Sequence, residues 1–159
     1  MLVKVEVASF GVDPGQKIPL IILKECGGER SLPLLIGSSE ASAIAIRTLD
    51  ISSERPLTID LVKLIMQELG GTLERVVICD LVDQIFYARL QISAKKSVRT
   101  VDCRPSDAIA LALRSDCPIF VEDSVFEKNE NKKVLSDKDK LKRDIANLDT
   151  LDFGRYYID

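Results

Sequence analysis

The stretch Ser39-Glu40-Ala41-Ser42-Ala43-Ile44-Ala45-Ile46-Arg47 recurs 67 residues later as Ser106-Asp107-Ala108-Ile109-Ala110-Leu111-Ala112-Leu113-Arg114. Both copies begin with Ser, an acid and Ala, continue with alanines that alternate with other residues, and close on Arg. This pattern is typical of an amphipathic helix whose small side chains permit close packing. Three short apolar segments precede the helix in each half, so each half is predicted to fold as β-β-β-α. The alternative is chance similarity between two alanine-rich helices.

The repeat predicts an α+β fold built from a duplicated β-β-β-α unit, with the two copies at about residues 2–49 and 72–116. A single unit has one helix to cover one apolar sheet face, and two packed units bury a better core. We therefore expect a mainly antiparallel or mixed sheet packed with helices. Residues 1–128 form the predicted domain, and residues 129–159 form a charged C-terminal extension with one helix at about 138–148.

Apolar runs separated by turn residues predict seven strands and three helices within the domain. Pro33 places the third strand at a sheet edge or its own start, because proline donates no backbone hydrogen bond. Ser39, Thr58 and Ser106 are the expected N-caps of the helices. The second helix is expected to carry an apolar stripe and to end at Gly70-Gly71. The strands are expected at 2–7, 18–23, 32–36, 75–80, 85–92, 98–103 and 118–121, and the stripe is Leu61, Leu64, Ile65 and Leu69.

The composition excludes several kinds of chemistry. The 159 residues include no histidine, which removes Ser-His-Asp and Cys-His nucleophile systems and every His-based metal site. The four cysteines form no C-x-x-C pair, which argues against structural zinc. The net charge of −3 gives no global basic field for nucleic acid. No apolar run approaches the roughly 18 residues of a membrane-spanning helix, so we expect a cytoplasmic protein without membrane contact.

The densest polar cluster lies at the junction of the sixth strand and the third helix. Free backbone N–H groups at a helix start, beside Arg104 and Ser106, suit an anion such as phosphate. Asp102 and Asp107 could hold a Mg²⁺ or Mn²⁺ ion. The structural alternative is that Ser106 and Asp107 cap the helix while Arg104 pairs with Asp102.

Three further groups are weaker candidates. Lys95 and Lys96 stand at a predicted hairpin tip, with Arg99 just beyond, and could reach nucleic-acid phosphates. The alternative is a solvated turn whose lysines discourage pairing between sheet edges. Glu40 is the repeat-mate of Asp107, and Asp60 lies in the first turn of the second helix, where an acid complements the helix dipole.

Several separated segments resemble the bifunctional nuclease domain family. They are 32–37 with Glu40-Ala41, Arg55–Leu61, Asp102–Arg114 and Pro118–Val121, in matching order and spacing over roughly residues 2–128. The resemblance implies a compact, oligomeric α+β domain, with DNase and RNase activity as described for plant members. Many members have Thr-His-Asp where this chain has Thr58-Ile59-Asp60, so a catalytic or metal-binding histidine at that position would be missing here.

Two functional hypotheses follow. In the first, the protein hydrolyses phosphodiester bonds of DNA and RNA, with Asp102 and Asp107 holding a divalent ion and Arg104 stabilising the transition state. Glu40 and Asp60 are reserve ligands. In the second, the same fold is a non-catalytic binding or regulatory module whose polar residues cap helices or bind a small anion. Under either hypothesis, alanine-rich helices and apolar strands in so small a domain favour a homodimer or a higher homo-oligomer.

Overall fold

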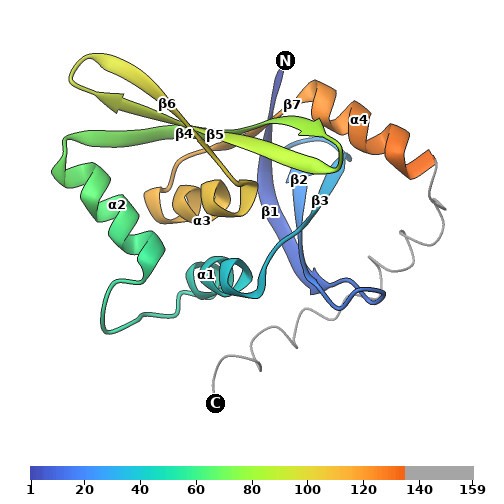
Figure 1. Ribbon diagram of the computed structural model, residues 1–159, viewed down its shortest axis with the longest axis horizontal. Coiled ribbons are helices and arrows are strands. Elements are labelled where there is room, and N and C mark those ends of the chain that lie inside the picture. Colours follow the sequence, from blue (N-terminus) through green and yellow to red (C-terminus); the bar gives the residue numbers. More distant parts are fainter. Residues whose placement is uncertain (135–159) are drawn as a thin grey trace.

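One mixed sheet organises the part of the chain that the structure describes. The computed structural model describes residues 1–134, with side chains through Glu130 (Figure 1). The sheet has the strand order β3-β2-β1-β7-β4-β5-β6. All neighbouring strands pair antiparallel except β4 and β7, which pair parallel. The strands are β1 (Leu2–Val12), β2 (Pro19–Glu25), β3 (Ser31–Leu35), β4 (Gly71–Val82), β5 (Ile85–Ala94), β6 (Ser97–Cys103) and β7 (Ile119–Glu122).

The α+β fold expected from the sequence is confirmed. The order β-β-β-α occurs twice, as β1-β2-β3-α1 and β4-β5-β6-α3. The helices α1 (Ser38–Thr48) and α3 (Pro105–Ser115) have bounds that differ by the offset of 67. Common descent of the two halves remains a prediction. β3 lies at one edge of the sheet, as Pro33 indicated, and β6 lies at the other.

Helices α1 and α3 pack against each other and against the sheet, and both lie beneath it in Figure 1. Their buried alanines, including Ala41, Ala108 and Ala112, allow this close approach. Pro105 starts α3, where a missing N–H costs nothing, and Asp116 ends it in the left-handed region with φ of 51°. Together with alternating strand residues such as Val3 and Val5, these helices form a continuous apolar core.

The helix N-caps differ from the prediction. Gly37, Leu57 and Arg104 occupy the cap positions, and none of their side chains caps a backbone N–H of its helix. Ser39, Thr58 and Ser106 therefore lie one or two residues inside their helices. Each expected cap was a polar residue near the true start, and the backbone becomes helical before it.

The second predicted helix is present as α2 (Thr58–Glu68). None of its residues is buried, and the predicted apolar stripe lies at the surface, with Leu61, Leu64, Ile65 and Leu69 all exposed. α2 lies to one side of α3, below the β5–β6 end of the sheet (Figure 1).

An additional helix, α4 (Asp123–Val134), follows β7 directly and spans the domain boundary expected at residue 128. Val125 and Phe126 of α4 are buried in the core, and Arg30 bonds Asp123 at 2.6 Å. The helix expected at 138–148 falls outside the described residues. No helix among residues 1–134 is long and apolar enough to cross a membrane.

Candidate functional site

The N-terminal end of α3 brings together three of the residues predicted from the sequence. Arg104 donates from Nε and Nη2 to the two carboxylate oxygens of Asp107, at 2.7 and 3.0 Å. Its Nη1 lies 2.7 Å from Oε1 of Glu40 at the start of α1. The guanidinium thus links the first turns of the two repeat-mate helices, and Glu40 and Asp107, the two repeat-mate acids, share it. We call Glu40, Arg104 and Asp107 the bridging cluster.

The bridging cluster is accessible but internally satisfied. The Arg104 side chain is 65% exposed, yet its Nε and Nη2 pair with Asp107 and its Nη1 pairs with Glu40. Hydrogen bonding to Asp107, with Glu40 nearby, raises the pKa of Arg104 above its usual value. Two carboxylates against one guanidinium leave a net charge of −1, which does not attract phosphate.

Asp102 is not part of the bridging cluster. It lies on the edge strand β6, opposite Arg89 on β5, and its side chain is exposed. No ion pair or hydrogen bond of its carboxylate is found within residues 1–130. The neighbouring Cys103 is partly buried, and this burial raises the pKa of its thiol to about 11, so Arg104 does not activate it.

The residues predicted to contact nucleic acid are divided between surface and interior. Lys95 and Lys96 form the β5–β6 turn with φ of 46° and 65°, the conformation of a two-residue hairpin turn, and both are exposed. Arg99 is exposed on β6, whereas Ser106 is only 7% exposed and lies below the surface.

A second polar centre lies at the other end of α3, around Asp60. Its Oδ2 accepts the backbone N–H of Leu57 at 2.8 Å, which anchors the start of α2. Its Oδ1 accepts from Nε of Arg114 at 2.5 Å. The Nζ of Lys63, one turn along α2, donates to the carbonyl oxygen of Arg114. Asp60 therefore does more than complement the dipole of α2, because it also links α2 to α3 through Arg114.

The charges around Asp60 keep it ionised. Burial alone would raise the pKa of Asp60, but the Leu57 N–H and the Arg114 guanidinium, with Lys63 nearby, lower it below its ordinary value. The Arg114 side chain is only 5% exposed, and its Nη1 also donates to the carbonyl oxygen of Ala110 at 3.1 Å. The pair is therefore a fixed ionic contact in the wall of a cleft.

This cleft has a volume of about 590 Å³ and lies between the end of α1, the α1–α2 connection, α2 and the end of α3. Four cationic side chains and three acidic ones line it, so its local charge is positive in a chain whose net charge is −3. Arg47, the repeat-mate of Arg114, donates to the Leu113 carbonyl at 3.1 Å and pairs with Asp50 at 3.2 Å and with Asp116 at 3.4 Å. We call this the basic cleft; its charged lining residues are Arg47, Glu54, Arg55, Asp60, Lys63, Arg114 and Asp116.

Sequence reasoning missed the basic cleft as a site, although its signals were present. Arg47 and Arg114 close the two repeats, and Arg55 and Asp60 belong to one of the family-like segments. What the sequence did not show is that the chain after α1 folds back so that this segment meets the end of α3.

The five predicted catalytic residues do not form one centre. Arg104 and Arg114 are ten residues apart on one helix, which corresponds to roughly 15 Å at 1.5 Å per residue. The bridging cluster and Asp60 therefore mark two separate places on α3, and Asp102 lies outside both.

The acids expected to hold a divalent ion do not come together as a group of ligands in the described part of the chain. Within the described residues, no group of three or more Asp, Glu, Cys or His side chains is placed to hold a metal ion. Two of the expected ligands, Glu40 and Asp107, are held by Arg104 instead. We derive no step of the chemistry through a metal.

Comparison with known proteins identifies the family. The family model of the bifunctional nuclease domain matches residues 21–133, which include both the bridging cluster and the basic cleft. The chain belongs to the bifunctional nuclease domain family. An uncharacterized protein of Mycobacterium tuberculosis is 41% identical over 123 residues, covering 77% of this chain and 73% of the relative.

Plant members of the family are more distant. Bifunctional nuclease 1 of Oryza sativa subsp. japonica and the bifunctional nuclease of Oryza minuta are each 29% identical over 118 residues, covering 72% of this chain. The match covers 36% of each plant protein, so this chain corresponds to about a third of their length.

Proposed function

We propose that this member of the bifunctional nuclease domain family hydrolyses phosphodiester bonds of DNA and RNA, and that the basic cleft binds the phosphate. The observation that supports this most is that four cationic side chains line one cleft, in which the ionised Asp60 lies beside Arg114 and Lys63. The names of the plant relatives support the reaction class. The cleft is favoured over the bridging cluster because Arg104 is already occupied by two carboxylates.

Each cleft residue has a role in this proposal. Arg55 is exposed, and no ion pair or hydrogen bond of its guanidinium is found within residues 1–130, so this group is available to a phosphate. Lys63 adds positive charge in the same cleft and stabilises the negative charge that develops on the phosphoryl oxygens. Asp60 fixes Arg114 and retains free lone pairs that can orient an attacking water molecule.

The assay is cleavage of supercoiled plasmid and of end-labelled RNA by the purified full chain. Lys63→Met is expected to lower the initial rate about 100-fold, the scale of losing one charged transition-state contact. Lys128→Met is the matched control, because Lys128 pairs with Asp80 on α4 and β4, outside the cleft. Equal cleavage by wild type and both variants would indicate a contaminating nuclease and contradict the proposal.

The dependence on Mg²⁺ or Mn²⁺ expected from the sequence is tested in the same assay. Reactions are run with each ion and with excess chelator, and Asp102→Asn, Asp107→Asn and Glu40→Gln are compared with wild type. Loss of activity in the chelator and in these variants would place a metal at the end of α3 where Arg104 lies, and would overturn the assignment to the basic cleft.

A non-catalytic binding module is the second candidate, and one observation favours it. Three of the five predicted catalytic residues, Glu40, Arg104 and Asp107, satisfy one another, and Asp60 is engaged by Leu57 and Arg114. Such contacts link helices without any chemistry. Under this alternative the protein binds an oligonucleotide, measured by fluorescence anisotropy, and Lys63→Met weakens binding although no cleavage occurs.

A further inference from the structure

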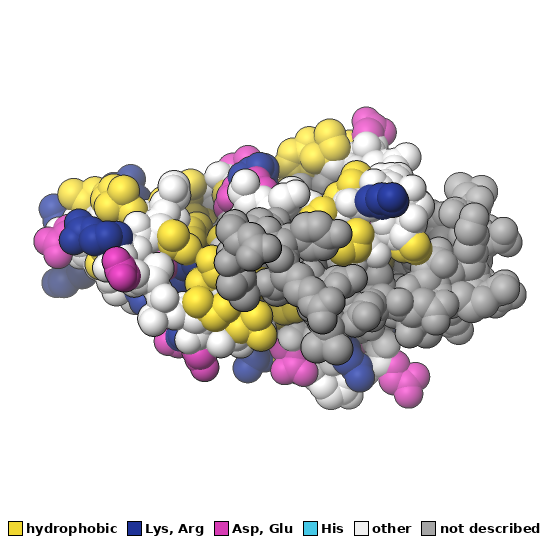
Figure 2. Space-filling view, turned by 90° about the horizontal axis from the view of Figure 1, so that it is seen from below, with side chains coloured by type: hydrophobic (Ala, Val, Ile, Leu, Met, Phe, Trp, Pro, Cys, Tyr) yellow, Lys and Arg dark blue, Asp and Glu magenta, His cyan; other side chains and the backbone are white. Residues whose placement is uncertain are grey.

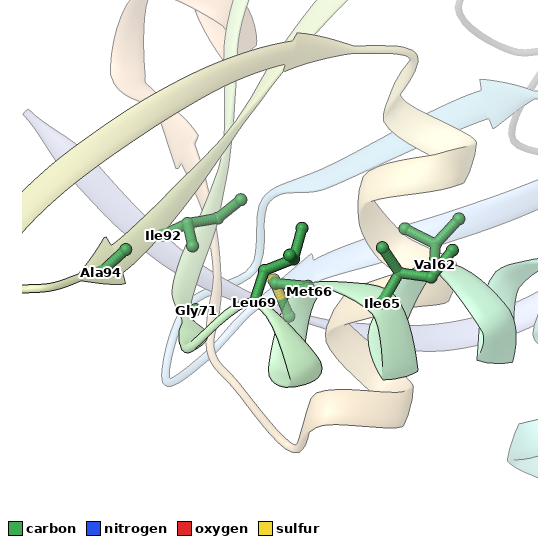
Figure 3. Close-up of a pocket in the computed structure, with 7 residues that line it drawn as sticks. All are labelled: Val62, Ile65, Met66, Leu69, Gly71, Ile92 and Ala94. Atoms are coloured by element: carbon green, nitrogen blue, oxygen red, sulfur yellow. The ribbon is translucent and has the colours of Figure 1, made fainter.

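The helix α2 has two sides that differ in chemistry. On the lower face of the molecule, hydrophobic side chains lie among charged ones (Figure 2). One side of α2 lies across from β5 and borders an almost wholly apolar groove of about 380 Å³ (Figure 3). The residues of α2 that line this groove are Val62, Ile65, Met66 and Leu69. The residues of α2 in the basic cleft are a different set, so the apolar Leu64 belongs to the cleft and not to the groove.

The residues of α2 that line the basic cleft follow one face of the helix. They are Asp60, Lys63, Leu64 and Gln67. Their spacing of i, i+3, i+4 and i+7 places helix side chains on one face. The charged end of this row is the end that contacts Arg114. Gln67 lies four residues beyond Lys63, about 6 Å further along the helix axis, so the cleft has a charged end and an uncharged end.

The uncharged end combines apolar surface with one amide. Leu64 is 43% exposed, and Pro56 of the α1–α2 connection is a second apolar lining residue. Gln67 is exposed, and no hydrogen bond of its side-chain amide is found within residues 1–130. Ser53, the remaining uncharged lining residue, is already engaged, because its hydroxyl donates to the carbonyl oxygen of Arg55 at 2.8 Å.

We propose that the uncharged end of the basic cleft holds a nucleobase, with Leu64 and Pro56 against the flat face of the ring and Gln67 hydrogen-bonded to its edge. A nucleobase has apolar faces and a polar edge, which is the combination that these three residues present. The base is joined through its sugar to a phosphate, and the charged end of the same cleft suits that phosphate. This inference rests on the proposed binding of phosphate in the basic cleft.

The amide of Gln67 favours adenine among the four bases. Its carbonyl oxygen accepts from the N6 amino group of adenine, and its NH₂ donates to the neighbouring N7. Guanine presents two acceptors on the same edge, so one of them meets the amide oxygen. A base reaches the wall of a cleft only after it leaves the stack of a duplex. We therefore expect the cleft to select unpaired adenine.

The first test measures how tightly the full chain binds inorganic phosphate, cytidine 5′-monophosphate and adenosine 5′-monophosphate in NMR titrations. Wild type is expected to bind the adenine nucleotide at least about fivefold more tightly than the cytosine nucleotide, and Gln67→Met is expected to remove this difference. Gln16→Met is the matched control, at an exposed glutamine in the β1–β2 turn outside the cleft. Equal affinity for the two nucleotides in wild type, or an adenine preference that survives in Gln67→Met, would overturn the proposal.

The second test examines the apolar wall of the site. Leu64→Ser is expected to weaken the binding of both nucleotides at least about fivefold relative to inorganic phosphate, because the face of the ring loses an apolar contact. Leu61→Ser is the matched control, since Leu61 is 50% exposed on the same helix and is not among the residues that line the cleft. Equal effects of the two substitutions, or no effect of Leu64→Ser, would contradict the placement of the base.

The same measurements separate the base from the reaction. Selective binding of the adenine nucleotide by a chain that cleaves neither plasmid nor RNA would refute the nuclease proposal and leave the base assignment in place. Cleavage that is lost in Lys63→Met, together with equal binding of both nucleotides by wild type, would leave the phosphate assignment in place and refute the base assignment. A wild type that binds none of the three ligands would contradict both.

Discussion

At the scale of single residues, the contact between Arg114 and Asp60 is the most consequential. The Arg114 side chain is almost fully buried, and removal of its carboxylate partner leaves a buried charge unpaired. We expect Asp60→Asn to lower the free energy of unfolding by about 1–3 kcal/mol in urea at pH 7. The loss is not larger because Asp60 is itself partly exposed, so water can reach the pair. Asp116→Asn, at an exposed carboxylate that Arg47 approaches from 3.4 Å, should change the stability by less than about 0.5 kcal/mol.

The contact between Asp60 and Arg114 also makes the stability of the protein depend on pH. The pKa of Asp60 is lower in the folded protein than its ordinary value of 3.8, so its stabilisation is complete above that value. It is lost as the pH falls through the folded pKa. The stability difference between wild type and Asp60→Asn should therefore be constant from neutral pH down to about pH 5 and shrink below about pH 4. A difference that grows on acidification would contradict the account.

The β4–β5 turn contains a residue that is poorly matched to its backbone. Gln84 has φ of 69°, in the left-handed region that glycine adopts without cost. Gln84→Gly should raise the free energy of unfolding by about 0.4–1 kcal/mol in chemical denaturation. Thr72→Gly is the control, at an exposed position inside β4. It should lower the free energy of unfolding by a similar amount, because glycine weakens a strand interior.

At the scale of elements, hydrophobic periodicity and turn residues predicted all seven strands and the helices α1, α2 and α3 near their observed positions. These signals are local: Val3 and Val5 alternate with Lys4, and Lys95-Lys96 form the turn that their position indicated. The errors depend on information beyond a few residues. The N-cap of each helix is set by where the backbone becomes helical, which a single polar residue does not reveal. The helix α4 was missed because Val125 and Phe126 are the only apolar residues that indicate its buried face within residues 123–130.

The apolar stripe of α2 shows a second limit of prediction from hydrophobic periodicity. Periodicity correctly predicts an apolar face on this helix, but it does not say whether that face meets the protein's own core or another molecule. For the bridging cluster, too, the sequence identified the residues but not their contacts. The acids and Arg104 were identified from their polar clustering, yet their mutual pairing and their separation from Asp60 follow from how α1 and α2 lie around α3.

The packing of α1 against α3 leads to a prediction at the same scale. Ala112 is buried on α3, where small side chains permit close packing with its neighbours. Ala112→Leu should destabilise the protein by about 1–3 kcal/mol in thermal or urea unfolding, because the added volume has no space. Ala43→Leu on α1 is only half-buried and should cost clearly less. Equal costs at the two positions would argue against tight packing at Ala112.

At the scale of the whole molecule, two halves meet at β7, which pairs with β1 of the first half and β4 of the second. This arrangement brings α3 of the second half against α1 and α2. Each end of α3 thereby presents an arginine to acids from the preceding chain, Arg104 to Glu40 and Arg114 to Asp60. Only the second of these places lies in a cleft with excess positive charge.

We propose that the basic cleft, and not the bridging cluster, binds the scissile phosphate. The most direct measurement compares initial rates of cleavage of one labelled single-stranded oligonucleotide by wild type, Arg55→Ala/Lys63→Ala and Arg104→Ala. The account predicts a loss of 100-fold or more in the double variant and less than tenfold in Arg104→Ala. A large loss in Arg104→Ala with little change in the double variant would contradict it.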